Sequence, residues 1–188
     1  LSHTGTANSG VSITGSDANY TVSVTGITGD GSFTLAASTG SDIEDSAAQG
    51  LASSVTSAAV AIDNMAPSVS IGSPSAASTN TGPVTYTVTY SGADSVSLAV
   101  EDVSLNKTGT ANGTIGISGS GKTSRTVTIS SITGTGSLGI SIAAGSASDT
   151  AGNLAPAAGP SSTFFVDNTL PVALSVAPET TGPTKQTT

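Results

Sequence analysis

The chain has 188 residues, a net charge of −8 and no cysteine or tryptophan, and only 9% of its residues are charged and 3% aromatic. This acidic balance repels a phosphate backbone or an anionic membrane, which excludes nucleic acid as a partner and argues against membrane insertion. Because large side chains are scarce, any core must be thin and built mainly from Val, Ile and Leu. Such a core favours a two-sheet sandwich over a fold with a deep catalytic pocket.

The start of the chain recurs later in the sequence. "TGTAN" at residues 4–8 returns at residues 108–112, and "AIDNMAPSVSI" from Ala61 returns as "FVDNTLPVALS" from Phe165, both 104 residues further on. A repeat of about 100 residues has the size of one immunoglobulin-type sandwich. The sequence therefore predicts a partial repeat with C-terminal strands over residues 1–64, a complete repeat over 67–168, and the first strand of a third repeat within 171–188.

Within the complete repeat, apolar and polar residues alternate at the period of a strand. "VTYTVTY" from Val84 puts Val and Tyr on one face and Thr on the other, and "SVSLAV" from Ser95 alternates in the same way. A later break in this parity predicts a β-bulge near Glu101 and Asp102. Gly-rich turns separate the remaining strands, which are expected at residues 69–71, 114–118, 124–130, 137–144 and 163–166. The repeat thus has seven strands and no helix, and the partial repeat keeps equivalents of the last four.

Four segments carry a resemblance to a known family. They are the linkers "DNMAP" at 63–67 and "DNTLP" at 167–171, "TGPVTYTVTYSGADSV" from Thr81, and "AAGSASDTAGNLA" from Ala143. They resemble the bacterial immunoglobulin-like tandem repeats of large secreted adhesins and biofilm surface proteins. The resemblance implies an extracellular, surface-anchored stalk of β-sandwiches, stiffened by calcium at the junctions between neighbouring repeats of the same chain.

Asp and Asn residues are predicted to meet where the chain enters the complete repeat. In a seven-stranded sandwich with alternating strand direction, the second-to-third and sixth-to-seventh loops lie beside the incoming linker. The candidate ligands on these three segments are Asp63, Asn64, Asp94, Asp149 and Asn153. Their oxygens are the hard ligands that Ca²⁺ takes, and Asp167 with Asn168 would serve the next junction. The alternative is that these residues only make turns, because Asp and Asn side chains cap local backbone groups.

Motifs for other chemistry are weaker. "GISGSGKT" from Gly116 fits the phosphate-loop pattern, but the residues after it predict a strand where phosphate binding needs a helix N-terminus. His3 is the only histidine, so no Ser-His-Asp triad or histidine-based metal centre can form, and the chain is not expected to be an enzyme. Glycosylation stays open at the three N-x-[ST] sequons, which begin at Asn19, Asn106 and Asn112.

Three functions compete on this sequence. The leading interpretation is a structural stalk or matrix fibre. The second is a self-assembling filament, because the first repeat lacks its first strands while "VALSV" after Pro171 is a first strand with no domain of its own, and strands can be donated between chains. A cut through a longer polypeptide would give the same pattern. Direct recognition of carbohydrate or ice is the third, but exposed aromatics are scarce and the Thr rows are short.

Overall fold

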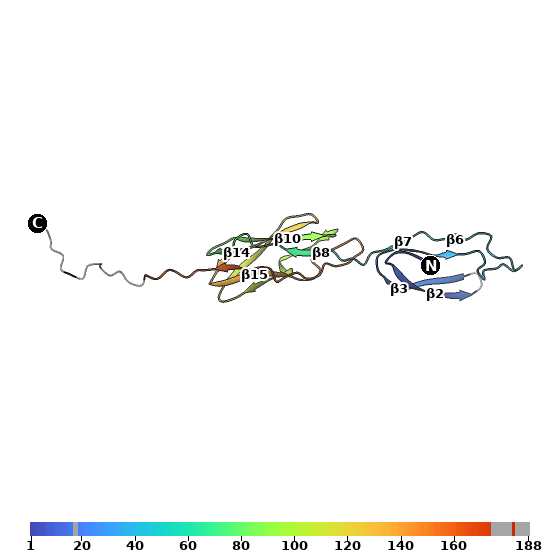
Figure 1. The fold of residues 1–188 in the computed structure, drawn as a ribbon, viewed down its shortest axis with the longest axis horizontal. Coiled ribbons are helices and arrows are strands. Elements are labelled where there is room, and N and C mark those ends of the chain that lie inside the picture. Colours follow the sequence, from blue (N-terminus) through green and yellow to red (C-terminus); the bar gives the residue numbers. More distant parts are fainter. Residues whose placement is uncertain (17–18, 174–181, 183–188) are drawn as a thin grey trace.

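The computed structural model describes residues 1–16, 19–173 and 182. Over these residues the regular structure is almost entirely strand, and its one helical element is the short 3-10 turn η1 (Val100–Asp102) (Figure 1). The all-β class predicted from the sequence is therefore confirmed. No helix in this part of the chain is long and apolar enough to cross a membrane.

Among the described residues, the strands fall into two groups that share no sheet. Strands of residues 1–62, the first unit, pair among themselves, and so do those of residues 68–166, the second unit. The two units lie end to end and are joined by the linker at residues 63–67 (Figure 1). The strand predicted at "VALSV", residues 172–176, lies mostly outside the described residues.

The second unit consists of two four-stranded sheets with a smaller two-stranded pair. The sheets have the strand orders β13-β14-β10-β8 and β12-β15-β17-β9, and the pair is β11-β16. All neighbours are antiparallel except β17 and β9, which run parallel. The strands are β8 (Ser68–Ile71), β9 (Ser78–Thr79), β10 (Val84–Ser91), β11 (Ser95–Val96), β12 (Val103–Lys107), β13 (Asn112–Ser118), β14 (Ser124–Thr133), β15 (Gly136–Ile142), β16 (Ala147–Ser148) and β17 (Phe164–Val166).

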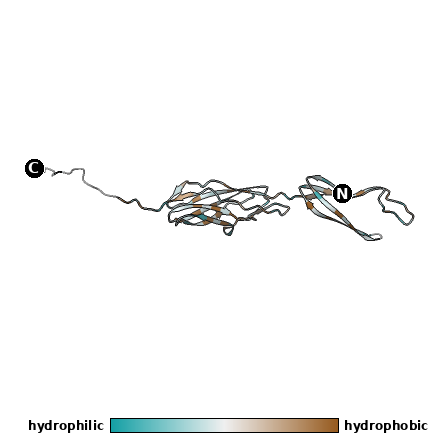
Figure 2. Cartoon of the chain, turned by 60° about the horizontal axis from the view of Figure 1, so that its bottom comes forward, coloured by the Kyte–Doolittle hydropathy of each residue, from teal (hydrophilic) through white to brown (hydrophobic). Residues whose placement is uncertain are grey.

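One hydrophobic core joins the two large sheets. On β10 the alternation seen in the sequence matches burial, since Val84, Tyr86 and Val88 are fully buried and the Thr residues after them are half-buried or exposed. Leu138 and Phe164 come from the opposite sheet and belong to the same buried cluster. Apolar and polar positions alternate along the strands in Figure 2. Burying one such side chain stabilises the fold by about 1.5–3 kcal/mol.

The segment between β10 and β13 differs from the prediction. The bulged strand expected near Glu101 and Asp102 is wrong, because the chain forms β11, then η1, then β12. The Asp102 carboxylate accepts a hydrogen bond from the backbone N–H of Ala99 at 2.9 Å and so closes this turn. β11 pairs with β16 whereas β12 pairs with β15, so the turn moves the chain from the small pair to a large sheet. Val100, expected to be inward, is 49% exposed, and the second unit has more strands than the seven predicted.

The first unit forms three small sheets with the orders β1-β4-β7, β2-β3 and β5-β6. Its β1 is the counterpart of the end of β12, so five strands rather than four have equivalents in the second unit. Ala7, Phe33 and Ile62 make up its small buried cluster. The strands are β1 (Ser2–Gly5), β2 (Asn8–Ser16), β3 (Asn19–Thr28), β4 (Gly31–Thr34), β5 (Ala36–Ala37), β6 (Val55–Thr56) and β7 (Val60–Ile62).

Threonine hydroxyls explain why "TGTAN" occurs in both units. The hydroxyl groups of Thr4 and Ser32 are hydrogen-bonded at 2.8 Å, and those of Thr108 and Ser137 are hydrogen-bonded at the same distance. In each unit the serine backbone N–H also donates to the threonine hydroxyl, at 3.0 and 2.9 Å. The two units therefore fasten the "TGTAN" segment to the strand after the long hairpin, β4 in the first unit and β15 in the second, with the same side chains.

A glycine in the turn before each of these strands, β4 and β15, allows a second close approach to the "TGTAN" segment. Gly29 and Gly134 have φ angles of +74° and +73°, a region that residues other than glycine rarely adopt. A Cβ would lie 2.1 Å from the carbonyl oxygen of Thr6 in the first unit, and 2.0 Å from that of Thr110 in the second. Only glycine fits at this close approach of two backbones.

Candidate cation site at the junction

The asparagine of each linker faces back to the unit that the chain has just left. The Asn64 side-chain amide donates to the carbonyl oxygen of Gly29 at 2.6 Å, and the Asn168 amide donates to that of Gly134 at 2.8 Å. These two contacts lie in the same turn of each unit. They fix the direction in which the chain leaves, and each uses the side-chain nitrogen of its asparagine.

The aspartate of each linker makes an Asx turn. One carboxylate oxygen of Asp63 accepts the backbone N–H of Met65 at 3.0 Å, and one of Asp167 accepts that of Thr169 at 2.9 Å. The Thr169 hydroxyl also donates to Asp167, and together these donors hold the pKa of Asp167 below its usual range. The turn thus uses one carboxylate oxygen of each aspartate and leaves the second carboxylate oxygen available.

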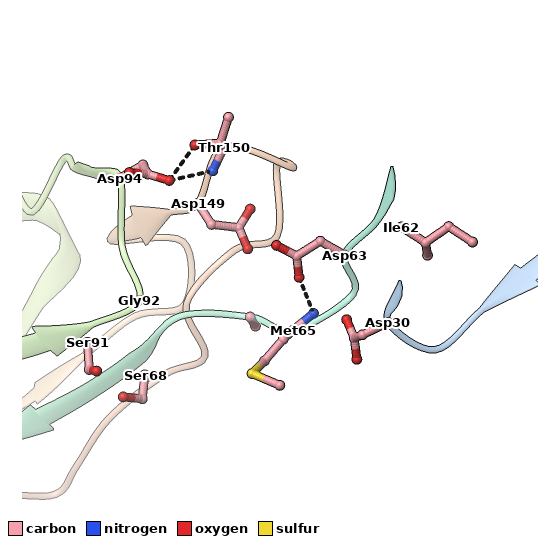
Figure 3. Close-up of a pocket in the computed structure, with 11 residues that line it drawn as sticks. Asp30, Ile62, Asp63, Met65, Ser68, Ser91, Gly92, Asp94, Asp149 and Thr150 are labelled. Atoms are coloured by element: carbon pink, nitrogen blue, oxygen red, sulfur yellow. Dashed lines mark hydrogen bonds between the residues drawn. The ribbon is translucent and has the colours of Figure 1, made fainter. Parts of the chain in front are cut away.

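An open groove of about 730 Å³ lies between the two units. Four carboxylates line it, from the first unit, the linker and two loops of the second unit: Asp30, Asp63, Asp94 and Asp149. Figure 3 shows the carboxylates of Asp63 and Asp149 pointing toward one another across the junction. The sequence predicted three of these four positions, and it missed Asp30.

Asp30 lies in the turn that precedes β4. One of its carboxylate oxygens accepts the backbone N–H of Asn64 at 2.7 Å. At the matching place in the second unit, the hydroxyl of Thr135 accepts the N–H of Asn168 at 3.2 Å. An uncharged residue can therefore accept this hydrogen bond from the linker. Asp30 adds to the groove a negative charge that the hydrogen bond does not require. The difference between "TGDGS" and "TGTGS" is the only sign of it in the sequence.

Asp94 already has a cationic partner. The Lys122 ammonium donates to one carboxylate oxygen at 2.7 Å, and the backbone N–H and hydroxyl of Thr150 donate to the other. The Lys122 and Thr150 side-chain hydrogen bonds lower the pKa of Asp94 to about 2, so it is ionised at neutral pH. Lys122 is the lysine of the phosphate-loop pattern, and the strand β14 that follows it leaves no helix N-terminus for a phosphate.

Asn153 connects the linker to the second unit. Its side-chain amide donates to the carbonyl oxygen of Asp63 at 3.0 Å and to a carboxylate oxygen of Asp149 at 2.9 Å. Its backbone N–H donates to the other oxygen of Asp149 at 2.9 Å. These bonds lower the pKa of Asp149, and the hydrogen bond from the Asn153 side chain has the largest effect. Asn153 therefore orients the Asp149 carboxylate while contacting the incoming chain.

The remaining predicted ligands are not in this groove. Asn64 faces the first unit, and Asp167 with Asn168 lies at the far end of the second unit, where the loops of a following repeat would fall outside the described residues. Within residues 1–16, 19–173 and 182, no three or more Asp, Glu, His or Cys residues form a group placed to hold a metal ion. The chemistry of the groove nevertheless suits a hard cation, since its charged groups are carboxylates.

The three glycosylation sequons differ in how free their asparagines are. Asn19 is exposed at the start of β3. The Asn106 side chain is half-buried and donates to the hydroxyl of Ser141 at 2.8 Å, so the fold uses it. The side-chain oxygen of Asn112 accepts a hydrogen bond from the Lys107 ammonium at 3.4 Å at the surface.

Comparison of the chain with protein-family models, curated proteins and solved structures gave no match. The immunoglobulin-like topology, the repeat length of about 104 residues and the metal role of the predicted ligands stay predictions.

Proposed function

We propose that this chain is a structural part of an extracellular surface fibre, built from tandem immunoglobulin-like sandwiches of about 104 residues. In this architecture it resembles the stalks of large bacterial adhesins and matrix filaments. It has no enzymatic role in this proposal. The observation that carries the proposal is the recurrence of one linker contact, from Asn64 to Gly29 and from Asn168 to Gly134. Because the same contact sets the exit of the chain from successive units, it sets the same direction each time.

The surface of the units suits a fibre. In a tandem array each repeat contacts mainly its neighbours, so length increases with the number of repeats and stiffness is decided at the junctions. On β10 of the second unit, Thr87 and Thr89 are exposed while the Val and Tyr residues between and beside them are buried. A polar exterior of this kind limits lateral sticking between extended molecules.

Calcium stiffens the junction in this proposal. The carboxylates of Asp30, Asp63 and Asp149 come from both units, and their like charges repel one another at low ionic strength. A bound Ca²⁺ would neutralise this repulsion and gather oxygen ligands at about 2.3–2.6 Å, with backbone carbonyls and water completing its shell. Since ligands from the first unit, the linker and the second unit would share one ion, the linker could no longer bend freely.

Calorimetric calcium titration of the chain tests the metal part of the proposal. We expect saturable binding that Asp149→Asn removes, because this change deletes a carboxylate that faces the groove. The matched control is Asp42→Asn, an exposed carboxyl in a loop of the first unit away from the groove. Equal binding by both variants, or no binding by the parent chain, would leave these aspartates as turn formers and would remove calcium from the account.

A further inference from the structure

One asparagine occupies matching places in the two units. Asn8 begins β2 and Asn112 begins β13, and both are exposed. In each unit the strand register shifts directly after this asparagine, between Asn8 and Gly10 and between Asn112 and Thr114. Such a shift marks a β-bulge, which interrupts the ladder of backbone hydrogen bonds. The two asparagines therefore share their exposure and their backbone setting, and they differ in their immediate neighbours.

These neighbours differ in two ways. The residue after the asparagine is Ser9 in the first unit and Gly113 in the second, and the residue before "TGTAN" is His3 in the first unit and Lys107 in the second. The His3 ring and the Ser9 hydroxyl share a hydrogen bond of 2.8 Å, whereas the Lys107 ammonium donates to the side-chain oxygen of Asn112 at 3.4 Å. Of the two asparagines, Asn112 alone combines a following glycine with a cation on its amide oxygen.

We propose that Asn112 is a site of spontaneous chemical modification, at which its side-chain amide is lost as ammonia. The backbone nitrogen of Gly113 gives up its proton and bonds to Cγ of Asn112, the Cγ–Nδ2 bond breaks, and the proton leaves on the ammonia. This step closes a succinimide ring. Solvent water then opens the ring at one of its two carbonyl groups and leaves aspartate or isoaspartate, so that no atom is oxidised or reduced.

Gly113 makes the attacking nitrogen accessible. Glycine has no side chain to hinder the approach of its backbone nitrogen to Cγ of the preceding residue. The fold itself demands this glycine, because a Cβ at Gly113 would lie 2.7 Å from Cγ2 of Ile129. Asn112 is also the first residue of a strand at the edge of its sheet, where local opening costs less than in the interior. Packing at the bulge thus places a reactive pair in an exposed and loosely held position.

The Lys107 ammonium assists the same step. As the nitrogen attacks, negative charge develops on the side-chain oxygen of Asn112, and a cationic donor to that oxygen stabilises it. Because the contact is long and lies at the surface, its effect on the rate is small, up to about fivefold. In the aspartate product the same ammonium faces a carboxylate.

The modification changes the end of the second unit from which the chain leaves. Asn112 pairs with Thr133, and the outgoing linker is held at the next residue, Gly134, by the Asn168 amide. The product adds a negative charge beside this turn, and isoaspartate also adds one carbon to the backbone at the bulge. Since the reaction needs only water, the modified form accumulates with the age of the molecule.

Peptide mass mapping of the full, unglycosylated chain after incubation near neutral pH tests this inference. Asn112 is expected to convert to aspartate and isoaspartate at least about ten times faster than Asn8, a difference of about 1.4 kcal/mol in activation free energy. The rate should rise with pH, because the attacking nitrogen must lose its proton. Equal rates at the two asparagines, or an Asn112 amide that survives in the folded chain while the chain unfolded in urea loses it, would overturn the proposal.

Variants of the two neighbours separate their contributions. Ser9→Gly adds no atom to the fold and should raise the rate at Asn8 toward that at Asn112, whereas Ser9→Ala should leave Asn8 slow. Lys107→Met should slow Asn112 by up to about fivefold, and Lys107→Arg should restore the rate. An unchanged rate at Asn8 in Ser9→Gly would contradict the role given to Gly113. These readouts depend on neither calcium nor the fibre role, so their failure is distinct from failure of the proposed function.

Discussion

The two units share their turns but not their cores. Thr4 and Thr108 make the same hydroxyl contacts, and Gly29 and Gly134 the same close backbone approach. Yet the first unit buries a cluster of three apolar residues, while the second buries a cluster that draws on both of its four-stranded sheets. Local glycine and threonine contacts can therefore define a hairpin without a full core. Burial of the apolar side chains of that hairpin depends on further strands that pack against it.

Truncation of a matched apolar pair should give the largest difference between the units. Phe164→Ala removes a fully buried ring and is expected to cost about 3–5 kcal/mol in the free energy of unfolding. Val60→Ala, at the corresponding place in the first unit, should cost less than about 1 kcal/mol because its side chain is half exposed. Urea unfolding of both variants measures this difference, and equal losses would show that the face of the first unit is covered.

Substitution at the turn glycines should instead affect both units alike. Gly29→Ala and Gly134→Ala each force a Cβ to about 2 Å from a carbonyl oxygen at positive φ, which is expected to destabilise by more than about 1 kcal/mol. Gly116→Ala is the control, since its Cβ would meet nothing within 4 Å. Hydrogen exchange of the two turns reports the effect in each unit. A loss of protection confined to one turn would contradict the equivalence of the two.

The sequence predicted these units unevenly, for identifiable physical reasons. The period-2 pattern of "VTYTVTY" predicted β10, because both its core face and its outer face follow from alternation. The same pattern did not predict η1. The hydrogen bond from Ala99 to the Asp102 carboxylate closes this turn, and it leaves no mark on the alternation of apolar and polar residues. The groove residues Asp63 and Asp149 could be placed from loop order. Asp30 and the ion pair of Lys122 with Asp94 could not, since neither follows from any spacing in the chain.

The smallest expected effect concerns the Asp94 carboxyl of the second unit. Its pKa of about 2 in the folded chain lies below the ordinary aspartate value of 3.8. A depressed folded-state pKa contributes stability above the unfolded value, and this contribution is lost as pH falls from about 4 through about 2. Lys122→Met should raise the pKa toward its ordinary value, as followed by NMR titration. Lys107→Met, whose ammonium contacts Asn112 instead, should leave it unchanged.

Small-angle scattering of the dilute chain, in calcium and in chelator, tests the central claim most directly. A junction stiffened by an ion shared between Asp63 and Asp149 predicts a longer maximum dimension and a narrower spread of shapes in calcium, with no change for Asp149→Asn. Identical scattering of the parent chain in both conditions would contradict the claim that calcium governs the stiffness of this fibre.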